Sequence, residues 1–410
     1  MRSHSHTDGG ASHRIHSAPR DLPTMLRSGL LLALLALLSI HTASACGADT
    51  CDGSAPIGDS FDPVTGVHHA ATDAQLQAAH QPSPTLRRIH SRLDGKGELV
   101  CAHVDFTLGH SHVTGPHTAT GMEPELCKGL AAALGVSVPR YWAMSQPSER
   151  FPLLQQGLVD VVFALTSKTI SRDLREAGSF SIPYFQDQHN LMVRSDRGIQ
   201  AGADLAGKTI CATRGTTNPN VLRDYLASID SELAGGKESV SVVEVDDDVT
   251  ALRMMREGAC DAFVNDDSVV AGYVHTEAPI SSDVRFVLAS WSGTPFARAP
   301  FSAVTLDGDA EWASIVDWFV NSLFLAEMYG VTSENVDRLA MDRTLPGEAQ
   351  RLLGSQLIGG QALPFDMRAA IRSIGNYAEL YERNFGAFLP RSRANMLYKD
   401  GGAVFPGGFR

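Results

Sequence analysis

The chain has 410 residues, of which 43% are hydrophobic and 20% charged, a composition that excludes wholesale disorder and leaves room for two hydrophobic cores. Its formal charge is −12 at pH 7, and no basic stripe interrupts it. Because phosphate backbones are bound by clustered Lys and Arg, we predict a soluble protein with no nucleic-acid partner.

The first predicted element is an export signal. An apolar run at residues 30–40 follows two arginines, and small residues around Ala45 suit cleavage by a signal peptidase. The run is too short to span a membrane comfortably. We therefore predict that residues 1–45 form a signal peptide and that the mature protein is periplasmic or otherwise extracytoplasmic. Met1 and Met25 are both candidate starts.

The predicted mature terminus offers two fates for Cys46. It could carry a lipid, as in a lipoprotein that is tethered to the membrane, or form a disulfide with Cys51. We favour simple secretion, because Ala43 stands where a lipobox prefers Leu. Residues 46–84 are rich in Gly, Ala, Asp, Pro and His and lack periodicity, which predicts a flexible leader.

From residue 85 onward, predicted strands alternate with predicted helices. The first series comprises helices at residues 85–97, 125–135 and 149–157 and strands at 98–104, 136–142 and 159–165. This alternation indicates an α/β fold with a mostly parallel, doubly wound sheet. We assign residues 85–196 to a first lobe.

A second series of the same kind follows. It comprises strands around residues 202–213, 239–245 and 260–265 and helices at 218–229 and 248–259. We assign residues 197–296 to a second lobe. The chain then returns, and a long amphipathic helix at 312–331 covers the first lobe, which therefore includes residues 297–345. Two crossings predict two hinge strands and a ligand cleft between the lobes.

Four cysteines in the predicted lobes suit an oxidising compartment. Cys101 and Cys127 fall in the first lobe, and Cys211 and Cys260 fall in the second, which allows two bridges that leave the lobes unlinked. Closing loops of this size stabilises a fold by about 3.5 and 4 kcal/mol in the chain-entropy account. The alternative is four buried free thiols, which behave as small hydrophobes.

Charged and hydroxyl side chains stand at the ends of elements in both lobes. Arg172 follows a strand of the first lobe, Asp266 follows a strand of the second, and Thr216 and Thr217 open a helix. An amino acid carries a carboxylate and an ammonium on one carbon, so a pocket for it needs a fork-shaped donor and a carboxylate. The pattern predicts a two-sided grip for a small zwitterion.

Each of these residues also has a plainer interpretation. Arg172 could pair with Asp173 at the surface, in a contact worth under about 1 kcal/mol. Thr216 and Thr217 could be helix N-caps, and Asp266 could lie in a solvated turn. We favour binding because the groups are complementary to one ligand.

Three histidines within nine residues raise the question of a metal. His110, His112 and His117 could ligate zinc, but the Gly and Pro residues between them are typical of a mobile loop. We assign no metal and no cofactor to the chain.

Several segments carry a family resemblance: residues 121–135, 148–161, 169–173, 208–218, the helix from Trp312, and 374–386. On these segments the chain, from about residue 85 to its end, resembles the general L-amino-acid-binding proteins of bacterial ABC importers, within the family-3 extracellular solute-binding proteins. The two internal cysteine pairs also fall where this subfamily places them. The resemblance implies a periplasmic-binding-protein-like fold of two lobes, with residues 346–410 as a helical C-terminal extension on lobe 1.

The resemblance also implies roles for individual residues. Arg172 would clamp the ligand carboxylate with Ser167, and Thr217 and the backbone around Gly215 would serve the same carboxylate from lobe 2. Asp266 would take the ammonium. The ligand would bridge both lobes and so stabilise their closed state. We expect a monomer that delivers an amino acid to the permease of an ABC transporter.

Departures from the subfamily pattern affect the ligand's side chain. Ala164 and Leu165 replace a cationic and an amide residue, although the backbone carbonyl of Leu165 is still expected at the ligand. Asp105 and Phe106 stand where side-chain selectivity is usually set, so Asp105, Phe106 and Ala164 are the candidate selectivity residues.

Two other functions use the same fold. A periplasmic enzyme resembling cyclohexadienyl dehydratase would need a general acid, which Glu123, Glu125 or one of the three histidines could supply. A sensory or accessory module would report the amino acid to a partner. We predict a binding protein that is not an enzyme, because no acid and base pair at a readable spacing near Arg172.

Overall fold

The computed structural model describes residues 83–105, 107–136, 138–233, 239–276, 284–289, 297–354 and 363–409, and the backbone of two short strands. These strands, β1 (Ser60–Asp62) and β2 (Val67–His69), pair antiparallel inside the predicted leader. They belong to a unit at Met1–Gln81 that is separate from the unit at Pro82–Arg410. The predicted signal peptide, Cys46 and Cys51 lie outside the described residues.

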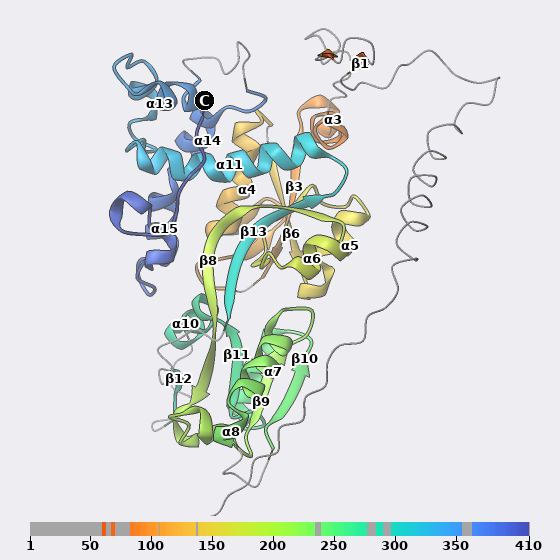
Figure 1. The fold of residues 1–410 in the computed structure, drawn as a ribbon, viewed down its shortest axis with the longest axis vertical. Coiled ribbons are helices and arrows are strands. Elements are labelled where there is room, and N and C mark those ends of the chain that lie inside the picture. The colour runs from red at the N-terminus through yellow and green to blue at the C-terminus, as the bar shows by residue number, and fades with distance from the viewer. Residues whose placement is uncertain are drawn as a thin grey trace, which may run out of the picture. The chain divides into compact units, whose positions relative to one another are not determined.

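The second unit is built on one long sheet that passes through both lobes. Its strand order is β10-β9-β11-β8-β13-β7-β3-β6, and β12 also pairs with β8. Two strands run from one lobe into the other, as Figure 1 shows: β8 (Gly178–Arg194) and β13 (Arg298–Leu306). The predicted α/β fold of two lobes joined by two hinge strands is confirmed.

Lobe 1 is built from the first part of the described chain and from the segment that returns after lobe 2. Its strands are β3 (Glu98–Val104), β6 (Val138–Met144), β7 (Val161–Val162) and a hairpin of β4 (His112–Gly115) and β5 (Thr118–Thr120). Its helices are α3 (Pro84–Ser91), α4 (Met122–Ala133), α5 (Arg150–Gln155), α6 (Ile170–Arg175) and α11 (Ala310–Met328). β3 pairs in parallel with β6 and β7, and β13 pairs antiparallel with β7.

Strand β7 is shorter than the predicted strand at 159–165. It continues as far as a hydrogen bond from Phe163 N to the Ala102 carbonyl, 3.1 Å long. Two residues later Leu165 has φ of +47°, in the left-handed region that side chains disfavour, and the chain turns out of the sheet. The turn carries the following residues into the cleft.

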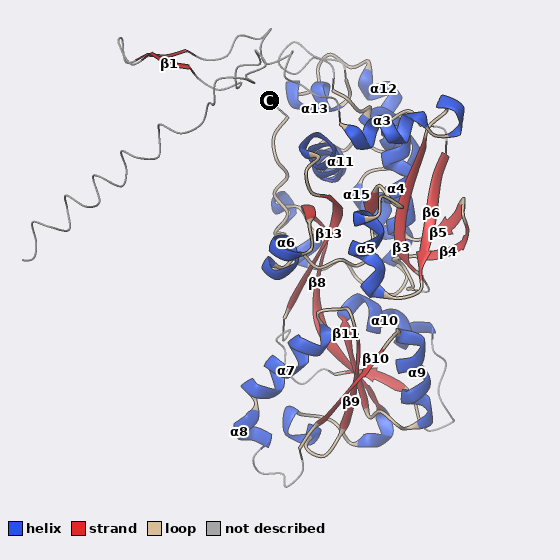
Figure 2. Ribbon diagram, turned by 90° about the vertical axis from the view of Figure 1, so that its right-hand side faces the viewer, coloured by secondary structure: helices blue, strands red, loops and turns tan. Residues whose placement is uncertain are grey.

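Lobe 2 repeats the layered arrangement. Its strands are β9 (Thr209–Thr213), β10 (Ser241–Val245), β11 (Ala262–Asp266) and β12 (Phe286–Leu288), and its helices are α7 (Asn218–Ser228), α8 (Asp230–Leu233), α9 (Asp248–Glu257) and α10 (Asp267–Thr276). β9 pairs in parallel with β10 and β11. Figure 2 shows the helices around these strands.

The first crossing comes earlier than the boundary at 196 in our sequence-based assignment. Residues 189–193 of β8 already pair with β11, whereas residues 178–188 pair with β13. The strand is continuous through the hinge, so no break in hydrophobic pattern marks the change of lobe.

The C-terminal region is helical and contacts lobe 1. It contains α12 (Val336–Ala340), α13 (Gly347–Leu352), α14 (Met367–Ile374) and α15 (Tyr377–Phe385). α14 packs on α4, and α15 packs on α4 and α11. A Cβ at Gly129 would lie 2.2 Å from Ile374 Cδ1, so the close approach of α4 and α14 requires this glycine.

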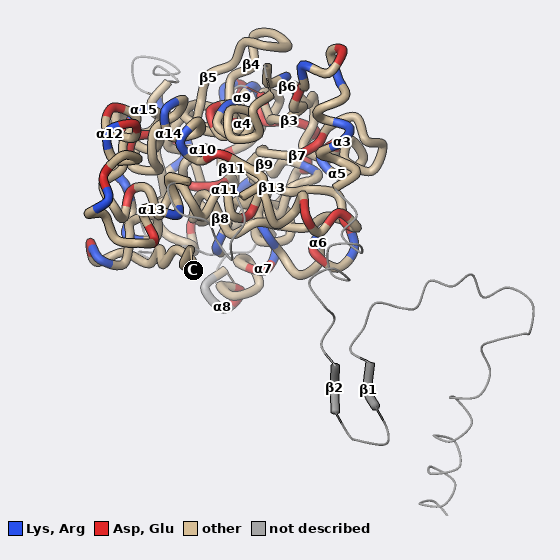
Figure 3. The backbone as a smooth tube through the Cα atoms, turned by 90° about the horizontal axis from the view of Figure 1, so that it is seen from above, with Lys and Arg blue, Asp and Glu red and all other residues tan. Residues whose placement is uncertain are grey.

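Both expected disulfides are present, Cys101–Cys127 in lobe 1 and Cys211–Cys260 in lobe 2. Neither crosses the hinge, so neither disulfide links the two lobes. No helix among the described residues is long and apolar enough to cross a membrane. Figure 3 shows Lys and Arg interspersed with Asp and Glu over the outer helices, in keeping with the absence of a basic stripe in the sequence.

Candidate functional site

A cavity of about 370 Å³ lies between the two lobes. Lobe 1 contributes Arg150, Leu165, Ser167 and Arg172 to its walls, and lobe 2 contributes Thr216, Thr217 and Asp266. The lobes touch on both sides of it, because a Cβ at Gly215 would lie 3.0 Å from Ser148 N and a Cβ at Gly272 would lie 3.2 Å from Leu108 Cβ. The described conformation is therefore a closed one.

Arg172 reaches the cavity from the short helix α6. Its Nη1 donates a 2.9 Å hydrogen bond to the Ser167 carbonyl, and its backbone N–H donates to Thr169 Oγ1, which caps the helix. Burial and the nearby charge of Arg150 lower the pKa of Arg172 to about 10, so the guanidinium stays charged at neutral pH. The guanidinium is thus held by a backbone dipole rather than by Asp173.

Arg150 is a second cation in the same cavity, which we did not predict. Its side chain is held by a 2.8 Å hydrogen bond from Nε to the Ala164 carbonyl, and the residue is only 3% exposed. Its Nη1 is buried and has no hydrogen-bond partner among the described residues. Such a buried donor is costly unless an acceptor arrives, which makes Arg150 a candidate ligand contact.

A buried carboxyl group fixes the strained turn at Leu165. Glu123 Oε1, in the first turn of α4, accepts hydrogen bonds from Leu165 N at 2.7 Å and from Tyr184 Oη at 2.5 Å. Burial raises the pKa of Glu123 to about 7. Because Glu123 does not line the cavity, its role is to position the backbone that does.

The lobe 2 wall begins at the N-terminus of α7. Thr216 Oγ1 donates to the Thr213 carbonyl at 2.6 Å and accepts from Asn218 N at 3.1 Å, in a turn just before the helix. The N-cap residue is Thr217, whose side chain makes no capping hydrogen bond. Thr217 Oγ1 lies 3.0 Å from His189 Nε2, on the hinge strand. Burial lowers the pKa of His189 to about 4, so this imidazole is neutral.

Two carboxylates of lobe 2 line the cavity in different ways. Asp248 accepts hydrogen bonds from Thr213, Asn265 and Tyr273 at 2.5, 2.8 and 3.0 Å. Asp266 is 8% exposed, and its Oδ1 accepts no hydrogen bond from a described residue. Burial raises the pKa of Asp266 to about 7, although the charges of Arg150 and Arg172 oppose this. Asp266 Oδ1, which lies 3.6 Å from the neutral His189 Nε2, is therefore left to accept from a cation.

Two of the predicted site residues that the structure describes, Gly215 and Ala164, do not line the cavity. Gly215 contacts Ser148 across the cleft instead of lining the cavity, so its glycine serves the contact between lobes. Ala164 is fully buried in the core and supplies only its carbonyl to Arg150. Phe106 lies outside the described residues. Asp105 does line the cavity and accepts from Val113 N at 2.9 Å.

The histidines of the predicted mobile loop are held in separate places. His110 is buried, with Nε2 2.7 Å from Ser268 Oγ, and His117 binds the Pro139 carbonyl at the surface through Nδ1. Their region was expected to be mobile, but its aromatic and polar packing is specific: His110 packs against Phe185.

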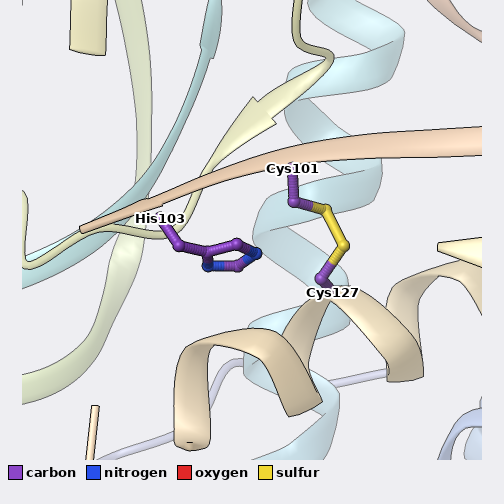
Figure 4. Close-up of side chains that lie close together, drawn as sticks. All are labelled: Cys101, His103 and Cys127. Carbon is purple, nitrogen blue, oxygen red and sulfur yellow. A yellow bond between two sulfur atoms is a disulfide. The ribbon is translucent and has the colours of Figure 1, made fainter. Parts of the chain in front are cut away.

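One group of potential metal ligands occurs among the described residues, Cys101, His103 and Cys127. Figure 4 shows the imidazole of His103 beside the bond that joins the two sulfur atoms. A cysteine binds a metal ion as a thiolate, and both cysteines here are joined in a disulfide. They therefore do not provide a metal centre.

Some of these residues carry recognisable signals and others do not. Arg172 and Asp266 follow strands, where ligands of α/β proteins gather. Arg150 lies in an amphipathic helix, where a charged residue is expected to face the solvent. Glu123 was predicted only as a possible catalytic acid, because its hydrogen-bond partner Leu165 is distant in the sequence.

Comparison with known proteins identifies the family of the chain. Residues 109–335 match the family model for bacterial extracellular solute-binding proteins, family 3. The chain is 29% identical to a glutamate/glutamine/aspartate/asparagine-binding protein, BztA, of Rhodobacter capsulatus, over 82% of this chain and 96% of that one. It is 28% identical to the general L-amino acid-binding periplasmic protein AapJ of Rhizobium johnstonii, over 77% and 91%.

A solved structure extends the similarity to the whole fold. The ABC transporter periplasmic binding protein from Brucella ovis, with glutathione bound, shares 27% identity and superposes with a TM-score of 0.70, over 81% of this chain and all of that one. The family match spans more than half of the chain. The chain therefore belongs to the family-3 bacterial extracellular solute-binding proteins.

Proposed function

We propose that this protein captures a free amino acid between its lobes and delivers it to the permease of an ABC importer. The carrying observation is that Arg172 and Asp266, from opposite lobes, line one closed cavity. Arg172 binds the α-carboxylate with Ser167 and the N-terminus of α7, and Asp266 binds the α-ammonium. The ligand thereby connects the lobes and stabilises their closed state.

Arg150 adds a second cation to this site. Its unpartnered Nη1 can donate either to the α-carboxylate or to an acceptor on the ligand's side chain. The names of the relatives, which include acidic amino acids and their amides, favour ligands with such an acceptor. Glutathione, which is bound in the Brucella ovis protein, belongs in the screen beside the twenty amino acids.

Binding without turnover fits the positions of the acids considered for catalysis. Glu123 is engaged by Leu165 and Tyr184, and Glu125 pairs with Arg383 at the surface. A dehydratase requires a proton donor at the reacting hydroxyl, within hydrogen-bond reach. Incubation with prephenate or arogenate is expected to return the substrate unchanged, and turnover would overturn this part of the proposal.

The cellular setting is proposed on the same basis. We propose that residues 1–45 direct export and are removed, which leaves a monomeric periplasmic protein with Cys46 as its first residue. A neighbouring pair of permease genes supports the importer role. Their absence, together with a tethering lipid on Cys46, would favour the sensory alternative.

The Arg172→Ala variant tests the site directly. We expect one or a few amino acids to raise the melting temperature of the mature protein and to bind Arg172→Ala at least about 30-fold more weakly, the loss typical of a buried charge partner. Arg175→Ala is the matched control, because Arg175 lies on the same helix, is exposed and does not line the cavity. Equal affinities in Arg172→Ala and the parent would remove Arg172 from the site.

A further inference from the structure

A second cavity adjoins the proposed amino-acid site. Its volume is about 790 Å³, and it shares three wall residues with the first cavity: Thr107, Val249 and Tyr273. Helices α9 and α10 of lobe 2 form one side. The other side is formed by β5 and by Arg383 and Asn384, near the end of α15. The two cavities together exceed the 300–1,000 Å³, roughly, that drug-sized ligands occupy, so a free amino acid leaves most of this space unused.

The walls of the second cavity differ in charge from those of the first. The first is lined by four aspartates, Asp105, Asp247, Asp248 and Asp266, together with Arg150 and Arg172. The second has no Asp or Glu among its described lining residues, but it has Arg256 and Arg383. Arg383 pairs with Glu125 through Nε and Nη2, which leaves its Nη1 to donate to a ligand. The second cavity therefore favours an anionic group.

Apolar side chains lie between the two charged regions. Val249 lines both cavities and is 65% exposed, and Leu108 lines the second cavity and is 38% exposed. Exposed side chains of this size stabilise a complex when a ligand covers them, by about 25 cal/mol for each Å² buried. An extension that crosses from the first cavity to the second would cover Val249.

The chemistry of the head group decides how such a ligand is linked. If the α-carboxylate and α-ammonium are both held in the first cavity, as the proposed function requires, the only remaining substituent on the α-carbon is the side chain. An ordinary peptide uses its α-carboxyl or α-amino group in the peptide bond. It cannot offer both poles from one carbon together with an extension through the backbone.

We infer that this protein takes amino acids whose side chain extends to a second carboxylate, with the zwitterionic head in the first cavity and the distal carboxylate in the second. Side-chain-linked glutamyl dipeptides and tripeptides have this chemistry. The inference rests on the proposed function and narrows its ligand class.

Two isomeric dipeptides separate the inference from simpler explanations. Isothermal titration calorimetry of the mature protein is expected to give γ-L-glutamyl-L-alanine at least about tenfold tighter binding than both α-L-glutamyl-L-alanine and L-glutamine, a difference of about 1.4 kcal/mol. The two dipeptides have the same composition and charge, so only the linkage distinguishes them. Equal binding of the isomers, or weaker binding of the γ-linked dipeptide than of glutamine, would overturn the inference.

A variant that fills only the second cavity locates the extension. Thr120, on β5, is exposed and lines the second cavity but not the first, whereas Thr118, exposed on the same strand, lines neither. Thr120→Trp is expected to weaken γ-L-glutamyl-L-alanine about tenfold and to leave free amino acids unaffected, while Thr118→Trp changes neither. Loss of the dipeptide and the free amino acids to the same extent would place the extension elsewhere.

The outcomes also separate the two proposals. Binding of free amino acids with exclusion of every γ-linked compound overturns the inference and leaves the proposed function standing. Binding of no compound, including the twenty amino acids, overturns the proposed function and the inference with it.

Discussion

The two walls of the cleft carry opposite charges that are held in different ways. In lobe 1, Arg150 and Arg172 donate to the carbonyls of Ala164 and Ser167, at 2.8 and 2.9 Å. In lobe 2, Asp266 keeps one oxygen without a hydrogen bond from any described residue. The cations are thus oriented by backbone dipoles before a ligand binds, while the carboxylate depends on what enters the cleft. Lobe 1 orients its cations through backbone carbonyls, and lobe 2 offers a carboxylate oxygen that a ligand can engage.

Removal of the carboxylate should have the largest effect. Asp266→Asn is expected to weaken binding of the amino-acid ligand about 100-fold, because it leaves the ligand's ammonium buried without its anion, at a cost of about 2–5 kcal/mol. The melting temperature of the unliganded variant should equal or exceed that of the parent at pH 8, since a buried carboxylate no longer has to be ionised. Calorimetry and thermal unfolding measure the two effects.

Asp267→Asn is the control for this variant. Asp267 Oδ1 accepts a 2.7 Å hydrogen bond from Asn190 on the hinge strand, and the residue does not line the cavity. Its affinity is expected to stay within about threefold of the parent, well under 1 kcal/mol. If Asp267→Asn lost as much affinity as Asp266→Asn, the anion would act through the hinge rather than on the ligand.

The same asymmetry explains which parts of the site the sequence predicts. Strand β3 was predicted at its observed bounds, because a buried apolar run between polar residues leaves one interpretation. Arg172 and Asp266 could be found because each follows a strand that the pattern reveals. Glu123 and Arg150 act on Leu165 and Ala164, whose neighbours in space come from other elements. Sequence periodicity reports which side faces the core, and it does not report such contacts.

The contact between the lobes should show the next largest effect. Gly215 has φ of +76°, and a Cβ there would lie 3.0 Å from the backbone N of Ser148 in lobe 1. Gly215→Ala is therefore expected to oppose closure and to weaken ligand binding about tenfold, measured by calorimetry, with small-angle scattering showing a more open protein at saturating ligand.

Gly198→Ala separates closure from backbone strain. Gly198 has φ of +65°, and a Cβ there would meet nothing within 4 Å. Both alanine variants are expected to lose about 1–2 kcal/mol of unfolding free energy from the left-handed conformation. Only Gly215→Ala should also lose affinity, and an equal loss in Gly198→Ala would attribute the effect to general destabilisation.

The smallest expected effect is a difference between the two lobes in how pH changes stability and ligand binding. Burial raises the pKa values of Glu123 and Asp266 to about 7 in the folded protein, above those of unfolded carboxyl groups. The folded state therefore binds the extra protons, and the stability that these groups contribute is present at low pH and lost as the pH rises through 7. Between pH 8 and pH 6 each group is expected to add about 1 kcal/mol to the unfolding free energy of the unliganded protein.

Ligand affinity should fall as the pH is lowered, in the opposite direction to stability. The ammonium requires ionised Asp266, which becomes protonated below pH 7. Glu123→Gln keeps an oxygen to accept from Leu165 and Tyr184 but does not titrate. Urea unfolding of this variant is expected to lose about 1 kcal/mol of the stability that the parent gains between pH 8 and pH 6, while calorimetry shows the parent's pH dependence of binding. If the pH dependence of binding disappeared instead, Glu123 in lobe 1 would be the group that senses the ligand, and the division of roles between the walls would be reversed.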